Sequence, residues 1–222
     1  MEPARKIDEA ETKPKRSRKR DREKTRQEIL DIALEEFTEN GFAAANTDVI
    51  AARAGITKRL IFYYFNSKEE LFVAVLDAAY TKMRRAEEDL GLDGLLPEAA
   101  IRTLAAFTFD FDQNNPAFVR LVLIENLLHG RHVARSSKAR AMTRPIIDQI
   151  RRVLARGVVE GVIRPGIDPV ELHMTLSALC FFSVSNRHTF EPQFSYDMSS
   201  SEAKARRRAE IADLIWRYVR KE

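Results

Sequence analysis

Residues 47–70, TDVIAARAGITKRLIFYYFNSKEE, contain two short helical segments joined by a tight turn, followed by the start of a third helix. Ile50, Ala51 and Ala54 place an apolar stripe on the first segment at helical spacing. Gly55 follows, where the turn requires a left-handed residue and any Cβ would add strain. The stretch therefore predicts a helix-turn-helix unit.

The second helix of this unit is expected to run from Thr57, whose hydroxyl is suited to cap it, to about Tyr64. Lys58 and Arg59 lie in its first turn, where the helix dipole already places partial positive charge. Positive charge at that end is favourable beside a polyanion. Helix-turn-helix proteins read the DNA major groove with the N-terminal residues of their second helix, so DNA is the favoured partner.

A family resemblance is carried by residues between Gly41 and Glu69. The matching positions are Gly41-Phe42, Thr47, Ile50-Ala51, Ala54-Gly55-Ile56-Thr57, Tyr63-Tyr64-Phe65 and Ser67-Lys68-Glu69. This segment resembles the DNA-binding signature of TetR/AcrR-type bacterial regulators, which is specific because small, aromatic and capping positions must coincide. Outside it the resemblance is one of length and helix layout.

The resemblance also predicts which residues of the helix-turn-helix unit contact DNA. Those residues are Thr47, Thr57, Lys58, Arg59, Tyr63, Tyr64 and Lys68. Two positions depart from the family pattern. Phe62 stands where the family often has a phosphate-binding tyrosine, and Asp48 stands where some members place a base-contacting arginine.

The composition favours a globular, helical chain. Of 222 residues, 45% are hydrophobic and 32% charged, and glycine and proline number 8 each, so we expect an all-α fold with almost no sheet. No apolar run approaches the ~18 residues of a membrane span, and the charged N-terminus lacks a secretory h-region. The single cysteine, Cys180, agrees with a reducing compartment. We expect a cytoplasmic protein without a membrane partner, and the net charge of +4 fits nucleic-acid binding.

Helix start and stop signals predict three parts and about nine helices. Residues 1–21 are predicted to be a disordered basic tail, which either follows DNA phosphates and the minor groove or is simply solvated. Residues 22–66 form the predicted helix-turn-helix DNA-binding domain. Residues 67–222 form the predicted helical domain for effector binding and dimerisation, and its first helix is the expected mechanical link between the two.

Several local features of these parts are also predicted. Capping boxes are expected at Thr25–Glu28, Ser67–Glu70 and Ser199–Glu202, and Asp168 is expected to cap a further helix. Residues 189–200 are predicted to be a polar loop. Residues 131–141 are either a loop or a short helix.

Residues 172–184 are apolar on nearly every side, and a helix that is apolar all round must be covered all round. The last helix carries a similar apolar surplus. Either these helices meet a second chain, or they are fully internal in a monomer. The resemblance implies a four-helix dimer interface, predicted at Leu172, Leu176, Leu179, Phe182, Leu214, Ile215 and Tyr218.

No sequence motif for catalysis or metal binding is present. His129 and His132 are three residues apart, but Gly130 interrupts the helix and no further ligand completes a set, so no metal is expected. Phosphate loops, nucleophile elbows and paired carboxylates are absent from the sequence, so neither an enzyme nor a cofactor is expected.

The family resemblance implies a small-molecule pocket between the middle helices, although each of its residues taken singly is also compatible with plain core. The predicted effector-binding residues are Phe107, Phe111, Leu123, Asn126, Leu127, Met142, His173, Ser177 and Phe181. The leading hypothesis is a homodimeric transcriptional repressor, released from a palindromic operator in double-stranded DNA by a small-molecule effector. The alternative is a dimeric DNA-binding protein without an effector, controlled by a protein partner.

Overall fold

The computed structural model describes residues 15–222, apart from the side chains of residues 15–20, 137 and 139–142. This described part is all-α, as predicted, with ten α-helices, two 3-10 helices and one isolated β-bridge. The α-helices are α1 (Lys15–Ala44), α2 (Thr47–Arg53), α3 (Lys58–Phe65), α4 (Lys68–Glu88), α5 (Pro97–Asn114), α6 (Pro116–Leu127), α7 (Ser137–Val159), α8 (Pro169–Ser185), α9 (Arg187–Phe194) and α10 (Ser201–Val219). The 3-10 helices are η1 (Leu92–Gly94) and η2 (Val133–Arg135). None of the helices described is long and apolar enough to cross a membrane.

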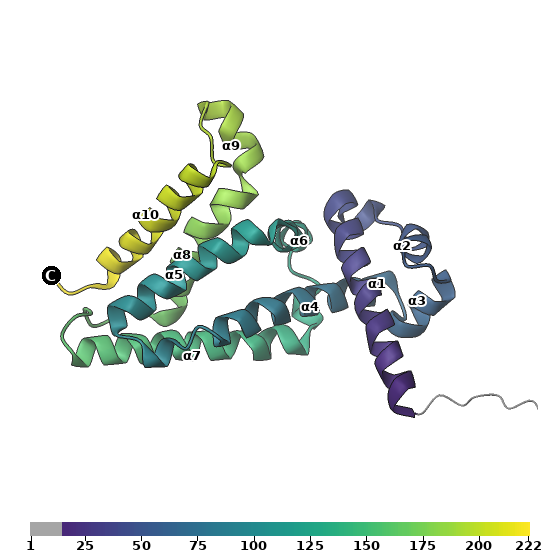
Figure 1. The fold of residues 1–222 in the computed structure, drawn as a ribbon, viewed down its shortest axis with the longest axis horizontal. Helices are drawn as coiled ribbons and strands as arrows, with labels where there is room; N and C mark the ends of the chain where they lie inside the picture. The colour runs from purple at the N-terminus through teal and green to yellow at the C-terminus, as the bar shows by residue number, and fades with distance from the viewer. Residues whose placement is uncertain (1–14) are drawn as a thin grey trace, which may run out of the picture.

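The helices form a small N-terminal unit and a larger bundle, joined by α4 (Figure 1). Helices α1, α2 and α3 gather at one end, while α5, α7, α8 and α10 build the bundle at the other. The core of the bundle is apolar and includes Leu104, Ile150, Leu176, Cys180 and Ile215. Helix α4 runs from the recognition region into this bundle, as the sequence predicted.

The core of the N-terminal unit continues past residue 66. Ile29 and Phe37 of α1 are buried together with Phe72 of α4, and Leu121 of α6 is buried in the same cluster with an exposed fraction of 0%. Helix α6 also packs along α1. The N-terminal unit and the larger domain therefore share one hydrophobic core at their junction.

Two predicted helix caps are confirmed. The Ser67 hydroxyl accepts a hydrogen bond from the Glu70 amide at 3.1 Å, and Asp168 accepts from the amides of Val170 and Glu171. For α10 the prediction was one residue early, because Ser200 rather than Ser199 is the N-cap.

Three local predictions at helix starts were wrong. Thr25 lies inside α1, where its hydroxyl donates to the Asp21 carbonyl, so it opens no capping box. Thr57 occupies the N-cap position of α3 without a side-chain cap bond. Residues 15–21, predicted as tail, continue α1 because their lysines and arginines are good helix formers; the remaining tail, residues 1–14, lies outside the described residues.

The first half of the predicted loop 189–200 is helical, since residues 189–194 belong to α9, whereas residues 195–200 lie outside the helices as predicted. The aromatic side chains of α9 supply the packing, with Phe190 in contact with Phe182 of α8 and stacked on Phe194. The ambiguous segment 131–141 contains η2 and the start of α7, which includes Pro145 near its beginning. The helix count is therefore ten within the described range instead of about nine.

Candidate nucleic-acid interface and ligand cavity

Helix α3 presents a basic, exposed face because its apolar side is fixed in the core. Ile61 and Phe65 are buried, and Gly55 supplies the left-handed turn before the helix with φ 64°. On the opposite face Arg59 is exposed and Tyr63, four residues later, has an exposed fraction of 63%. Side chains four residues apart lie on one side of a helix, so both point outward together.

Arg59, at the start of α3, is a cation that is free to bind a new partner. It has no hydrogen bond or ion pair to any residue that the structure describes. The neighbouring Lys58 ammonium instead contacts the Asp48 carboxylate of α2 at 2.8 Å. Both groups are solvent-exposed, so this pair is weak enough to open when a phosphate approaches.

Further cations and hydroxyls lie at the edge of the recognition surface. Arg22 donates a hydrogen bond to the Tyr63 hydroxyl at 2.7 Å and lies over its ring. Lys68 donates to the Ala43 carbonyl at 3.1 Å, above the ring of Phe42. These positions suit contacts with the DNA backbone rather than with base edges.

One of the predicted DNA contacts needs correction. Thr47 has an exposed fraction of only 7%, because it lies at the start of α2 against the core, so its side chain offers little surface to DNA. Tyr64 is half-buried and packs against the N-terminal core. The exposed predicted residues are Thr57, Lys58, Arg59 and Tyr63, with Lys68 half-exposed beside them.

A partly open cavity of about 200 Å³ lies between α4, α5, α6 and α8. Its lining residues are Tyr80, Met83, Arg84, Thr108, Asp112, Phe118, Val122, His173, Ser177 and Phe181. Three of the predicted effector-binding residues, all on α8, line it: His173, Ser177 and Phe181. Aromatic rings and a methionine supply most of its apolar wall.

The cavity also holds ionisable groups whose hydrogen-bonding capacity is unused. Burial raises the pKa of Asp112 to about 7, and no residue in the described part of the chain donates a hydrogen bond to its carboxyl. Burial, with the nearby Arg84 charge, lowers the pKa of His173 to about 4, and its Nδ1 has no partner. Arg84 forms a buried ion pair with Glu87, whose pKa is raised by burial.

The remaining predicted effector residues do not line the cavity. The Phe111 ring makes an edge-to-face contact with the ring of Phe118, and Phe107 packs beside Phe111. Leu127 is 79% exposed at the end of α6, so the prediction that it lines a pocket was wrong. Asn126 is also exposed, with its amide donating to the Val122 carbonyl at 2.9 Å.

Leu123 is half-buried outside the cavity wall, and the side chain of Met142 is not among those described. Sequence reasoning missed Arg84 and Asp112. The signal was present, because each is a charged residue on the buried face of an amphipathic helix.

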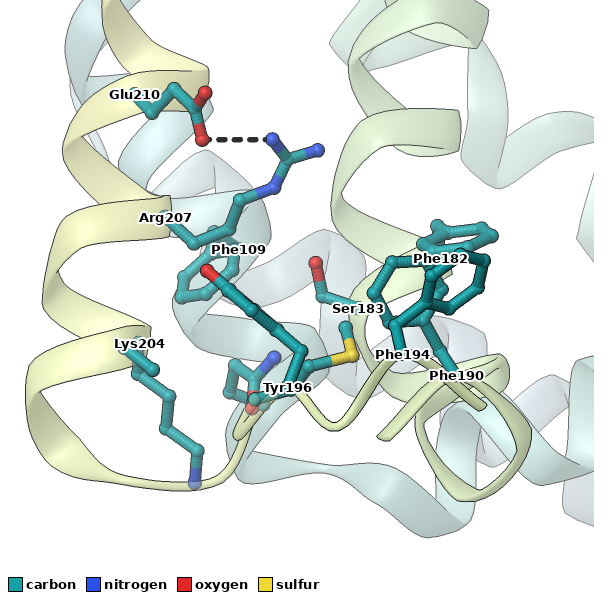
Figure 2. Close-up of a pocket in the computed structure, with 12 residues that line it drawn as sticks. Phe109, Phe182, Ser183, Phe190, Phe194, Tyr196, Lys204, Arg207 and Glu210 are labelled. Atoms are coloured by element: carbon teal, nitrogen blue, oxygen red, sulfur yellow. Dashed lines mark hydrogen bonds and ion pairs between the residues drawn. The ribbon is translucent and has the colours of Figure 1, made fainter. Parts of the chain in front are cut away.

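A second hollow, a groove of about 490 Å³, opens between α8, α9 and α10, with Phe109 and Gln113 of α5 also in its lining. Figure 2 shows its aromatic side chains, with Phe182, Phe190 and Phe194 gathered on one side and Arg207 and Glu210 of α10 on the other. Phe182 in this groove is 41% exposed, and Met174, eight residues earlier on α8, is 64% exposed.

Helix α10 exposes Leu214 and Tyr218, each at 44%. Three of the predicted interface residues are buried inside the protomer itself: Leu172, Leu176 and Ile215 have exposed fractions of 1–2%. Leu179 is half-buried against the same core. These four residues pack the bundle. The other three predicted interface residues, Phe182, Leu214 and Tyr218, are exposed, and with Met174 they form an apolar face whose members lie eight residues apart on α8 and four apart on α10.

The segment between α6 and α7 provides a second link to the DNA-binding unit. His132 is buried at 1%, with its ring 4.9 Å from those of both Phe42 and Phe72. Its Nδ1 lies 2.8 Å from Glu125 Oε2, and its amide donates to Oε1 of the same carboxylate. His132 thus has a structural partner in Glu125.

Taken together, an exposed basic second helix and a separate cavity-bearing bundle define a DNA-binding protein of the helix-turn-helix class. Residues 29–75 match the family model "Bacterial regulatory proteins, tetR family", and residues 97–215 match "Tetracyclin repressor-like, C-terminal domain". The chain belongs to the TetR family of transcriptional regulators.

The chain is similar over most of its length to a curated relative. It is 35% identical over 199 residues to the HTH-type transcriptional repressor NicS of Pseudomonas putida, covering 90% of this chain and 94% of that protein. Two solved structures share the fold. FadR of Bacillus subtilis, solved with stearoyl-CoA, has 19% identity and a TM-score of 0.62, covering 85% of this chain and 96% of FadR. AibR, solved with isovaleryl coenzyme A and operator DNA, has 14% identity and a TM-score of 0.64, covering 86% of this chain and 98% of AibR.

Proposed function

We propose that this regulator is a homodimeric repressor that binds a palindromic operator and is released from it by a small molecule. The observation that carries the DNA part is the exposed face of α3, with Arg59 unpaired at its start. The similarity to the repressor NicS supports repression rather than activation. The cavity supports effector control, as does the structural likeness to AibR, which was solved with both a ligand and operator DNA.

The proposed dimer places the exposed apolar residues of α8 and α10 against the same residues of a second chain. Met174 and Phe182 supply the α8 stripe, and Leu214 and Tyr218 supply the α10 stripe. Because a two-fold axis makes such an interface self-complementary, it also relates two recognition helices by the same symmetry. Two-fold symmetric heads read two half-sites in inverted order, which is the reason for proposing a palindrome.

Arg59→Ala is expected to relax sequence preference, because a good base contact contributes ~1–3 kcal/mol of discrimination against the wrong base. Lys68→Ala is expected to weaken binding to all sequences alike and to lower the salt slope by about 1, as for a phosphate contact. The measurement is fluorescence anisotropy with operator and scrambled duplexes at several salt concentrations. If both variants bind both duplexes like the wild type, α3 is not the recognition helix.

The effector part of the proposal rests on two contacts between the cavity and the DNA-binding unit. Helix α4 lines the cavity with Tyr80 and Arg84 and enters the N-terminal core with Phe72. Helix α6 lines it with Phe118 and places Leu121 in that same core. A ligand that displaces either helix therefore biases the positions of the DNA-binding heads.

Phe181→Trp is expected to fill the cavity and abolish the ligand response, while affinity for the operator without ligand stays close to that of the wild type. A thermal-shift screen of small metabolites identifies a ligand, and operator titration with it measures the response, typically ~5–150-fold for coupled sites. Phe194→Trp is the matched control, since Phe194 is exposed and lies outside the cavity. A ligand that raises the melting temperature without changing operator affinity contradicts the switch.

A further inference from the structure

The chemistry of the cavity between α4, α5, α6 and α8 restricts the molecule that it binds. Its volume is about 200 Å³. An apolar cavity of about 150 Å³ is known to hold benzene, so this space holds one ring with a short substituent. The rings of Tyr80, Phe118 and Phe181 line it and present flat apolar surfaces. The shape therefore favours a single aromatic ring.

The polar wall of the cavity contains one cation, Arg84, and one acid, Asp112. Arg84 brings a positive charge, but Glu87 is paired with it, with side-chain exposures of 11% and 2%. His173 is neutral near pH 7, since burial holds its pKa at about 4. Asp112 is then the group whose charge has no counterpart in the wall, and it is 3% exposed with no hydrogen bond to any described residue.

Such a carboxyl is costly in the free protein and favourable to a suitable ligand. A buried polar group without a partner carries a desolvation penalty, which a ligand removes by donating a hydrogen bond. A ligand carboxylate has no donor for this group and adds a second negative charge beside it. An N–H group, neutral or cationic, satisfies Asp112 in either protonation state.

We propose that this cavity binds a single-ring aromatic molecule bearing an N–H donor, neutral or cationic, with the donor on the Asp112 carboxyl. This inference rests on the proposed effector role of the cavity and adds the chemical class of its ligand. His173 Nδ1, which is also without a partner, is available to a second polar atom of the same ligand.

The protonation of Asp112 gives this proposal a pH signature. The ionisable side chains that line the cavity with it are Tyr80 and Arg84 of α4 and His173 of α8, and the Cys180 thiol of α8 also interacts electrostatically with it. With a pKa of about 7 for Asp112, its ionised fraction rises roughly tenfold between about pH 6 and about pH 8. A cationic ligand should bind correspondingly more tightly at the higher pH, and a neutral amide should change less.

The test is isothermal titration of the full-length protein with three probes of similar shape: benzamidine, benzamide and benzoate. We expect benzamidine and benzamide to bind, benzamidine to bind roughly tenfold more tightly at about pH 8 than at about pH 6, and benzoate to bind more weakly than either. Asp112→Asn should remove most of the benzamidine affinity and its pH dependence while keeping benzamide binding. Asp110→Asn is the matched control, because Asp110 is on the same helix but contacts Arg208 instead of the cavity.

Several results of these titrations would contradict the proposal. Benzoate binding more tightly than benzamidine, unchanged benzamidine binding in Asp112→Asn, or no binding of any probe each overturns the ligand class. Ser177→Leu narrows the cavity without touching Asp112, so probe binding that survives it shows that the probes bind elsewhere and also overturns the proposal. Probes that bind as expected but leave operator affinity unchanged support the ligand chemistry and contradict the effector role. A second readout is thermal: Asp112→Asn without ligand should melt several degrees higher than the wild type at about pH 8. The difference should be smaller at about pH 5 and should vanish only below the ordinary pKa of 3.8.

Discussion

Leu214→Glu is expected to convert the protein from dimer to monomer and to weaken operator binding by ~10²–10⁴-fold, the usual gain from linking two binding modules. In the monomer Leu214 is already 44% exposed, so a carboxylate there leaves the folded protomer intact. In the proposed dimer the same carboxylate is buried without a partner, which carries a large desolvation cost. Each DNA-binding head then binds its half-site alone.

Sedimentation velocity at micromolar concentration, together with operator titration, measures both parts of this prediction. Leu127→Glu is the control, because Leu127 is 79% exposed but lies on α6, away from the proposed face. It should leave both the sedimentation coefficient and the operator affinity unchanged. A Leu214→Glu variant that sediments as a dimer would show that α8 and α10 do not form the interface through this stripe.

The choice of Leu214 illustrates what sequence can and cannot predict about this surface. The apolar surplus of α8 and α10 is visible in the sequence, because it depends only on composition and helical spacing. Which of those residues face inward depends on how the two helices pack against α5. Leu176 and Ile215 turn into the protomer core, whereas Met174 and Leu214, only one or two positions away, stay exposed.

The same distinction applies to the DNA-binding surface. Gly55, Arg59 and Ser67 were identified from sequence because turns, dipoles and caps are local in the chain. The burial of Thr47 depends on contacts between α2 and the rest of the N-terminal core, which no local pattern specifies. Likewise, residues 189–194 of α9 were predicted as a loop because their packing comes from Phe182, which belongs to another helix.

The cavity was the least predictable feature. Its wall takes residues from α4, α5, α6 and α8, so its composition is set by tertiary packing. Asp112 and Arg84 do carry a sequence signal, a charge on the buried face of an amphipathic helix, but the signal does not say whether the charge meets a partner or a void. Arg84 forms an ion pair with Glu87, whereas Asp112 lines the cavity.

Phe72→Ala is expected to lower the free energy of unfolding by ~3–5 kcal/mol, the usual cost of truncating a buried aromatic residue. Phe72 is 0% exposed, and its ring lies 4.9 Å from that of Phe37, 5.1 Å from that of Phe42 and 4.9 Å from that of His132. Those partners come from α1, from its kinked end and from the segment after α6. The substitution therefore leaves a void where the DNA-binding unit meets the larger domain.

Because Leu121 joins the two units in one core, we expect them to unfold together. The single tryptophan, Trp216, lies in the core of the larger domain and reports on that domain alone, whereas circular dichroism reports on all helices. Urea unfolding followed by both signals should shift by the same amount in Phe72→Ala. Two separated transitions would show instead that the N-terminal unit unfolds independently.

Phe109→Ala separates a loss of stability from a loss of function. Phe109 is 2% exposed in the core of the larger domain, so its truncation should cost a similar free energy of unfolding. Measured well below the melting temperature of either variant, operator affinity should fall in Phe72→Ala, since α1 and α4 lose a contact in the core on which the recognition helix α3 packs. It should stay near that of the wild type in Phe109→Ala, because that void lies far from α3. Equal losses of operator affinity in the two variants would mean that general loosening, and not the junction around Phe72, sets the position of the DNA-binding unit.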